Sequence, residues 1–162
     1  MGAEETNKMT FGSLLKPEAV KVVMSVTSKK RLLQELGETA GSVYGIDPVV
    51  AVRALQEREN LGPTGVGNGV ALPHAHVDGL EKVVGVFVVL EKPIDFDAVD
   101  KLPVDLAFAL FAPSDAGVEH LKALAKVSRA LRDGARCGKL RSNKNVSTLY
   151  TIITEDVSKL VA

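Results

Sequence analysis

Two apolar runs in the middle of the chain decide the fold: Val83–Leu90, VVGVFVVL, and Val104–Phe111, VDLAFALF. Each run is continuously apolar rather than alternating, a pattern typical of strands buried on both faces. The segment between them, Glu91–Pro103, contains two prolines and several acidic residues, so we expect a loop there. Further out, Val20–Met24 is short and rich in β-branched residues and predicts another strand.

Helical signals lie between the expected strand Val20–Met24 and the first apolar run, Val83–Leu90. Ser28 is a favourable N-cap for a helix over Lys29–Val43, and Gly45 is a typical residue just beyond a helix end. Asp47-Pro48 predicts the start of a second helix, which extends to about Asn60, where a Gly-Pro pair follows. We therefore expect two consecutive helices in this part of the chain.

Three further helices are expected after the second apolar run. The first is capped by Ser114 or Asp115, the second covers Asp133–Leu140 and the third covers Ser147–Val157. Strands and helices thus interleave along 162 residues without a long spacer, which predicts one domain over residues 1–162. We expect an α/β or α+β layered fold, a sheet covered by helices, with residues 1–12 forming a flexible terminus.

The composition excludes several classes of partner. Twenty basic and twenty acidic residues give a formal net charge of zero, so no bulk field attracts nucleic acid or an anionic membrane. Aromatic residues make up only 4%, which leaves few platforms for stacking bases. The longest apolar run is far shorter than the ~20 residues that span a bilayer. We therefore expect no nucleic acid as a partner and no insertion into a membrane.

The cysteine content and the N-terminal segment predict a cytoplasmic location. The single cysteine, Cys137, cannot form an internal disulfide, which fits a reducing compartment. Met1–Thr10 is polar and acidic, unlike a signal peptide. Met1–Thr6 matches the loose pattern for N-myristoylation, but so short a pattern recurs by chance, and we interpret it as a frayed terminus.

A glycine-rich stretch leads into a histidine. Gly65–Gly69 is too rich in glycine for a regular element, and it precedes a short expected strand, Val70–Leu72, which Pro73 closes just before His74. Successive backbone N–H groups in such a turn can bind an anion, and histidine is a nucleophile whose charge is adjustable near neutral pH. The combination suits phosphoryl chemistry on histidine. The glycine cluster taken alone fits a simple tight turn equally well.

Two other residues are candidates for the same site. His120 lies on the expected third helix beside the apolar Leu121, at the edge of the buried face, and Arg58 carries a planar guanidinium that suits phosphate. Taken alone, His120 is also consistent with a hydrogen-bonded packing residue. Arg58 has Glu59 beside it and, taken alone, is also consistent with a solvated surface charge.

A metal site is the chemical alternative. His74 and His76 alternate, so on an extended segment both would face one side and, with His120, could supply the three imidazoles of a zinc site. Pro73 and the Asp78-Gly79 pair instead suggest that the segment turns, and no fourth ligand stands out. We therefore rank metal binding behind phosphoryl chemistry.

The stretch Arg58–His74, RENLGPTGVGNGVALPH, resembles the enzyme IIA domains of the fructose/mannitol class of the bacterial phosphotransferase system, and most of all their nitrogen-regulatory branch. Pro93–Asp100, PIDFDAVD, Pro103–Leu106, PVDL, and His120-Leu121 match the same family in order. The similarity runs from about Leu14 to Val157. It implies a mixed sheet flanked by helices on both faces.

The resemblance also implies roles for individual residues. It makes His74 the residue that is phosphorylated, through Nε2, by an HPr-like phosphocarrier protein. His120 then contacts the phosphoryl group, Arg58 lines the same pocket, and Thr64 and Asn68 match polar positions beside it. We expect the backbone amides of Gly67, Asn68, Gly69 and Val70 to bind the phosphoryl oxygens as well, with no cofactor and no metal.

The chain departs from the family pattern at three positions. Asn60 stands where lysine is common, and Pro63 stands where serine is usual, which removes one backbone N–H from the turn. His76 stands where lysine or threonine is frequent, and its role is open.

A docking surface for the carrier should surround His74 and be partly apolar. Its candidates are Val66, Val77, Leu80 and Phe96, of which we expect Phe96 to belong to the core. The phosphorylation state of the protein would then be read by regulatory target proteins. The alternatives are a sugar-transport IIA component that passes the phosphoryl group to a IIB protein, and a pocket that binds an anion without covalent chemistry.

Overall fold

The computed structural model describes residues 9–155 as a mixed sheet between two layers of helices. The strands are β1 (Val20–Val23), β2 (Gly65–Gly67), β3 (Val70–Ala71), β4 (His74–His76), β5 (Val84–Ile94) and β6 (Val104–Ala112). Their order is β1-β5-β6-β3-β2, and β4 also pairs with β6. The antiparallel β5–β6 pair forms the centre, and β1 joins β5 and β3 joins β6 in parallel.

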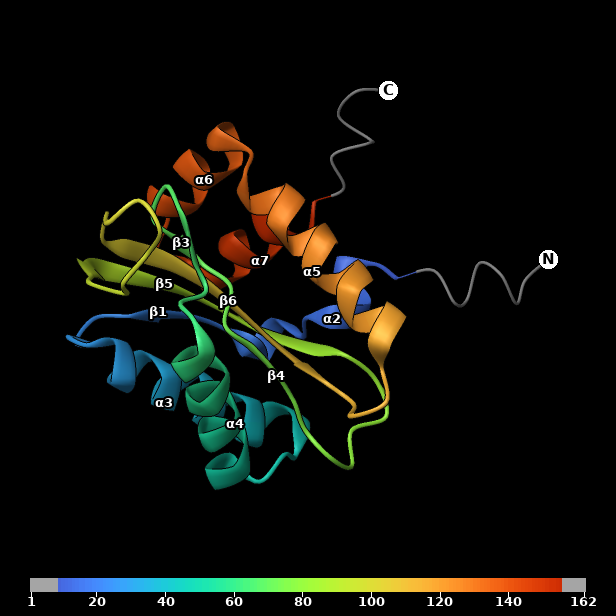
Figure 1. The fold of residues 1–162 in the computed structure, drawn as a ribbon. Helices are drawn as coiled ribbons and strands as arrows, with labels where there is room; N and C mark the ends of the chain where they lie inside the picture. Colours follow the sequence, from blue (N-terminus) through green and yellow to red (C-terminus); the bar gives the residue numbers. More distant parts are fainter. Residues whose placement is uncertain (1–8, 156–162) are drawn as a thin grey trace.

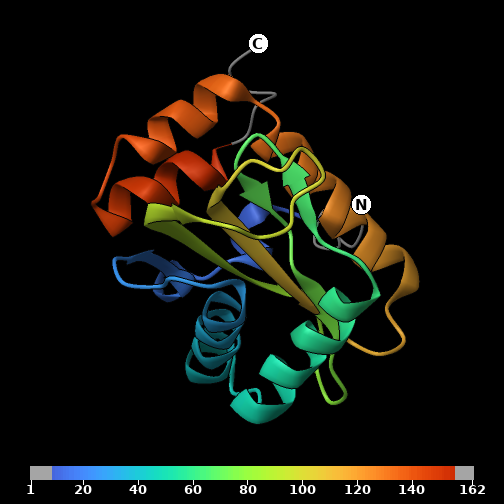
Figure 2. The same cartoon turned by 60° about the vertical axis from the view of Figure 1, so that its left-hand side comes forward.

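Helices cover both faces of this sheet (Figures 1 and 2). On one face lie α3 (Lys29–Tyr44) and α4 (Pro48–Leu61). On the other lie α2 (Phe11–Leu14), α5 (Gly117–Leu131), α6 (Gly134–Arg141) and α7 (Val146–Thr154), and a short 3₁₀ turn over Pro17–Ala19 leads into β1. The α/β class and the two helical layers are therefore confirmed. No helix among residues 9–155 is long and apolar enough to cross a membrane.

The two central strands are buried because their side chains are apolar on both faces. Phe87 of β5 and Phe108 of β6 face each other in register, and their rings lie 5.9 Å apart. Phe11 of α2 packs edge-on against Phe108, with ring centroids 6.1 Å apart. This last contact shows that the expected flexible terminus is too long, since residues 11 and 12 already belong to a helix. Residues 1–8, which contain the myristoylation pattern, lie outside the described part.

The first two predicted helices are confirmed at their caps. Ser28 accepts a hydrogen bond from the Arg31 amide, and Gly45 ends α3 in the left-handed region at φ 75°. Asp47 caps α4 through the Val49 amide. In the C-terminal half, the helix expected over Asp133–Leu140 is α6, and Asp133 is its N-cap, accepting hydrogen bonds from the amides of the first turn.

The predicted cap of α5 is wrong. Its N-cap is Ala116, which makes no side-chain hydrogen bond, and Gly117 is the first helical residue. Ser114 donates instead to the Asp78 carboxylate, so its hydroxyl joins the loop after β4 to the loop before α5. Residue 157, the expected end of the last helix, lies outside the described range, and α7 ends at Thr154.

Three loop predictions are corrected. Gly65–Gly67 is a strand, because Gly65 and Gly67 pair with Ala71 and Val70 in a hairpin that turns at Asn68. The expected 91–103 loop begins later, since β5 continues through Ile94. Residues 74–76, which we expected in a turning segment, form strand β4.

Pairing with β6 positions His74. Val70 and Ala71 of β3 pair with Leu106 and Ala107, and His74 of β4 pairs further along the same strand with Leu110. Pro73 lies between the two short strands and its carbonyl accepts the Leu110 amide, so β6 stays paired although proline offers no N–H. His74 is thereby held on the backbone of a buried central strand.

Glycine at position 37 allows α3 and α4 to pack closely, and we expect Gly37→Ala to destabilise the fold. An added Cβ would lie 2.5 Å from Val52 Cγ2 and 2.8 Å from the Val52 amide nitrogen. Overpacking of this kind costs about 1–3 kcal/mol of unfolding free energy, measurable by urea denaturation. Gly138→Ala in α6 is the matched control, because its added Cβ meets nothing within 4 Å and the change should raise stability by up to about 1 kcal/mol. Equal stabilities for the two variants would contradict this account of the α3–α4 contact.

Candidate functional site

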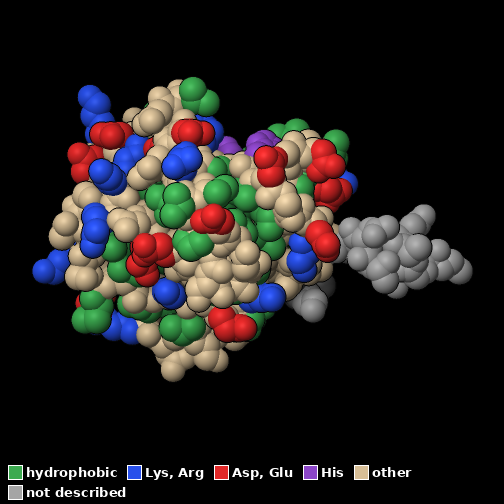
Figure 3. Space-filling view, turned by 90° about the horizontal axis from the view of Figure 1, so that it is seen from below, with side chains coloured by type: hydrophobic (Ala, Val, Ile, Leu, Met, Phe, Trp, Pro, Cys, Tyr) green, Lys and Arg blue, Asp and Glu red, His purple; other side chains and the backbone are tan. Residues whose placement is uncertain are grey.

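The three histidines of the chain come together at one end of the sheet. His74 and His76 lie on the same side of β4, and His120 reaches them from the first turn of α5. The His120 ring centroid lies 5.4 Å from that of His74 and 4.7 Å from that of His76, both edge-on. In the view from below, histidine atoms reach the surface beside hydrophobic side chains (Figure 3).

The hydrogen bond at His74 defines its reactive nitrogen. Nδ1 lies 2.8 Å from the carbonyl oxygen of Leu72. Because a carbonyl only accepts hydrogen bonds, Nδ1 carries the proton, and the neutral ring keeps its lone pair on Nε2. The ring is half-buried, and burial lowers the pKa of His74, as does the charge of Arg58. At neutral pH, His74 therefore presents an unprotonated nitrogen, which is the form that acts as a nucleophile.

His120 is the most buried of the three, with only 6% of its surface exposed. Its Nδ1 lies 3.1 Å from Nε2 of His76, whereas its own Nε2 is buried without a hydrogen-bond partner among the described residues. Burial, and then the neighbouring His74 and His76, lower the pKa of His120 to about 4. The ring is thus neutral near pH 7. A buried polar atom without a partner costs free energy, and such atoms concentrate at sites that bind a ligand.

Arg58 supplies the positive charge near His74. It lies in the last turn of α4, and its Nη1 donates to the Gly62 carbonyl at 2.9 Å, which leaves other guanidinium donors available. Helix α4 packs against β4, and the charge of Arg58 is among the causes that lower the pKa of His74. The structure therefore brings Arg58, His74 and His120 into one region.

Glu59 was missed by sequence reasoning, which named it only as a charged neighbour of Arg58. It is only 8% exposed, and its carboxylate accepts the Thr64 amide at 2.6 Å and the Thr64 hydroxyl at 2.7 Å. Lys29 lies 3.6 Å from the same carboxylate. The signal available in the sequence was helical spacing, because Ala51, Leu55 and Glu59 recur every four residues on the buried face of α4.

The Thr64 hydroxyl is therefore engaged with Glu59. The Thr64 carbonyl accepts the Leu72 amide at 2.9 Å, which joins the end of α4 to the residue whose own carbonyl holds His74. Thr64 thus lies beside the site and supports its backbone.

The structure does not bring Gly67, Asn68, Gly69 and Val70 to His74. Val70 and His74 pair with Leu106 and Leu110, positions about 13 Å apart along β6 at ~3.3 Å per residue. The Asn68 amide instead donates to Asp100, and the Gly69 carbonyl accepts two amides from the start of β6. Glycine suits position 69 because its φ of 79° lies in the left-handed region, which other residues adopt only with strain. The sequence suggested proximity because it could not show that β3 and β4 lie end to end on one strand.

The four candidate residues for a docking surface differ in exposure. Val66 is exposed, Leu80 is partly buried, and Val77 and Phe96 belong to the core. The position of Phe96 in the core confirms our expectation. The exposed apolar side chains nearest to the site in the chain were missed: Leu61 follows Arg58 at the end of α4 with 85% of its surface exposed, and Val118 and Leu121 flank His120 at 64% and 68%.

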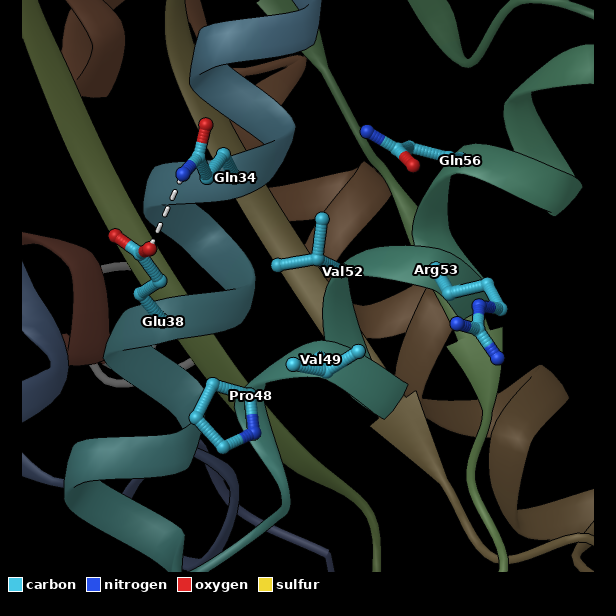
Figure 4. Close-up of a pocket in the computed structure, with 7 residues that line it drawn as sticks. All are labelled: Gln34, Glu38, Pro48, Val49, Val52, Arg53 and Gln56. Atoms are coloured by element: carbon cyan, nitrogen blue, oxygen red, sulfur yellow. Dashed lines mark hydrogen bonds between the residues drawn. The ribbon is translucent and has the colours of Figure 1, made fainter.

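A separate groove of about 340 Å³ lies between α3 and α4 (Figure 4). It is lined by Gln34, Glu38, Pro48, Val49, Val52, Arg53 and Gln56, with Gln34 donating to Glu38 at 3.2 Å. None of the histidines lines it, so it is distinct from the candidate site.

The metal alternative receives no geometric support. The segment His74–His76 is extended, whereas we ranked metal binding second because we expected this segment to turn. Within residues 9–155, however, no group of three or more His, Cys, Asp or Glu side chains is placed to hold a metal ion. Cys137 is free, buried and remote from the site in α6, with its thiol directed to the Leu131 carbonyl.

Comparison with known proteins identifies the family. Residues 13–156 match the family model described as "Phosphoenolpyruvate-dependent sugar phosphotransferase system, EIIA 2". The chain therefore belongs to this enzyme IIA family, whose members are phosphocarrier components of the phosphotransferase system. The resemblance inferred from Arg58–His74 is confirmed.

The relatives then identify the branch. The chain is 43% identical over 145 residues to a nitrogen regulatory protein of Bradyrhizobium diazoefficiens, covering 90% of this chain and 95% of that one. A crystal structure of the nitrogen regulatory protein IIA-Ntr from Neisseria meningitidis superposes with a TM-score of 0.81 at 33% identity, covering 88% and 98%. A chain in the structure of the complex of the Escherichia coli mannitol enzyme IIA with phosphorylated enzyme IIB shares the fold, with a TM-score of 0.74 at 22% identity. The match covers 86% of this chain and 98% of that one. The protein is a phosphocarrier of the nitrogen-regulatory branch.

The buried neutral His120 makes stability depend on pH. Its pKa of about 4 lies below the ordinary 6.5, so the unfolded chain binds a proton that the folded protein excludes. Its contribution to stability is therefore unchanged above pH 6.5 and is lost as the pH falls toward 4, by at most about 3 kcal/mol. Urea unfolding of the wild type and His120→Asn across this range isolates the effect from the carboxylates. Parallel stability curves for the two proteins would contradict the assignment.

Proposed function

We propose that His74 is the residue that carries the phosphoryl group, and that it accepts this group through Nε2 from an HPr-like phosphocarrier protein. The observation that carries the proposal is the hydrogen bond between His74 Nδ1 and the Leu72 carbonyl, since it leaves the lone pair on Nε2. Membership of the enzyme IIA family supports phosphoryl transfer as the reaction.

The chemical step exchanges one N–P bond for another. The Nε2 lone pair attacks the phosphorus of the carrier's phosphohistidine, and the electron pair of the broken N–P bond returns to the carrier's imidazole. The proton of His74 stays on Nδ1, hydrogen-bonded to the Leu72 carbonyl, throughout the step, so no proton has to leave the acceptor. Transfer then depends on positioning and on stabilising charge on the equatorial oxygens.

Two side chains stabilise that charge in this proposal. Arg58 offers a guanidinium from the end of α4, the helix that packs against β4, and the buried Nε2 of His120 offers a nitrogen with no other partner among the described residues. Thr64 and Glu59 support the backbone from which Leu72 holds His74. The Gly67–Val70 hairpin lies too far along β6 to share this role.

The carrier would dock on the apolar side chains around the site. Leu61, Val118 and Leu121 are strongly exposed on the two helix ends that supply Arg58 and His120. A zero net charge gives little long-range steering, which favours docking by local apolar contact.

The acceptor of the phosphorylated form is a regulatory target protein or a IIB component. The Bradyrhizobium and Neisseria relatives are named for nitrogen regulation, which favours a target whose activity depends on the state of His74. The mannitol enzyme IIA forms a complex with a phosphorylated IIB, so a IIB acceptor is the second candidate.

Replacement of His74 tests the proposal directly. The full chain is incubated with phosphoenolpyruvate and the general phosphotransferase proteins, and its intact mass is measured. The wild type should gain one phosphoryl group that is labile in acid and stable in base. His74→Ala should gain none, and His120→Ala should gain it slowly, because the acceptor nitrogen remains. Uptake of phosphate by His74→Ala would refute the assignment.

A charge placed on the proposed docking surface should weaken the encounter. Leu121→Asp is expected to raise the KM for the phosphorylated carrier roughly tenfold with little change in kcat, because a charged group must be desolvated at the centre of the interface. Val146→Asp, an exposed position on α7, is the matched control and should leave both constants unchanged. Equal KM values for the two variants would remove the docking role from this surface.

A further inference from the structure

We propose that His76 is a positioning residue: it donates its Nε2–H to Nδ1 of His120 and so holds the proton of His120 on Nε2, where it can bind the phosphoryl group on His74. The inference rests on the proposed role of His74. It assigns a function to a histidine whose role the sequence left open.

The contact is specific in geometry. His76 Nε2 and His120 Nδ1 are 3.1 Å apart, within the range of a hydrogen bond, although one residue is on β4 and the other is 44 positions later on α5. Alternation along β4 places His74 and His76 on one side of the strand, so His120 contacts both rings.

A hydrogen bond between two neutral imidazoles has two possible directions. If His120 donates from Nδ1, its Nε2 carries a lone pair, which would repel the oxygens of a phosphoryl group. If His76 donates, the His120 proton resides on Nε2, and that buried nitrogen becomes a donor without a competing partner among the described residues. Only the second direction stabilises a negative group on His74.

The exposure of the two rings makes the second direction accessible. His76 is exposed, so water can satisfy its Nδ1 in either tautomer, and it donates from Nε2 at little cost. His120 is buried, and its Nδ1 has His76 as its partner. The hydrogen bond from His76 therefore selects the tautomer of His120.

Nuclear magnetic resonance of the full chain with ¹⁵N-labelled histidine tests the tautomer without any phosphoryl transfer. Near neutral pH, long-range ¹H–¹⁵N correlations should show His120 protonated on Nε2 in the wild type. His76→Ala should give a mixture of tautomers, and His76→Lys, whose ammonium only donates, should restore the Nε2–H form. An Nδ1–H tautomer in the wild type, or an unchanged tautomer in His76→Ala, would overturn the proposal.

Transfer kinetics give the second readout. The rate of His74 phosphorylation should fall on the order of tenfold in His76→Ala, as for other residues that orient a functional histidine, and should recover in His76→Lys. Lys139→Ala, an exposed change on α6 remote from the site, should alter neither the rate nor the tautomer. An unchanged rate in His76→Ala would overturn the positioning role. Phosphorylation of His74→Ala would instead refute the proposed function, whatever the tautomer of His120.

Discussion

The hydrogen bond from His74 to the Leu72 carbonyl is the interaction on which the site depends, and it forms at a break between two short strands, β3 and β4, that pair with β6. Pro73 cannot donate to β6, so β3 ends before it and β4 resumes after it on the same neighbour. In the break, the Leu72 amide bonds to Thr64 and its carbonyl is left for the imidazole. The tautomer of His74 is thus fixed by the path of the backbone.

Burial keeps the imidazoles neutral, and it costs the folded state free energy. Desolvation lowers the pKa of both His74 and His120, which keeps them neutral, and it leaves one nitrogen of His120 without a partner among residues 9–155. Such a nitrogen is a cost to the resting fold that binding of an oxygen ligand can offset. The stable frame that tolerates this cost is the central β5–β6 pair with its facing phenylalanines.

The sequence predicted what depends on local pattern. The apolar runs of β5 and β6 follow from their composition, and the caps Ser28 and Asp47 follow from capping chemistry. The predictions from sequence were wrong where the structure depends on which strands pair with each other. The hairpin at Gly65–Gly67 is paired through backbone groups that carry no side-chain signal, and its distance from His74 follows only from the register on β6.

The same distinction explains the site. His74, His120 and Arg58 were named as candidates from residue type and family resemblance, whereas Glu59 was named only as a neighbour of Arg58, because charged residues are mostly exposed. A carboxylate buried on α4 is tolerable only with partners, and it has them in the Thr64 amide, the Thr64 hydroxyl and Lys29. These contacts fasten the chain just after Arg58 to the chain that leads to Leu72. One buried carboxylate therefore connects the end of α4, which carries Arg58, to the backbone that orients His74, so replacing Glu59 would disturb both at once.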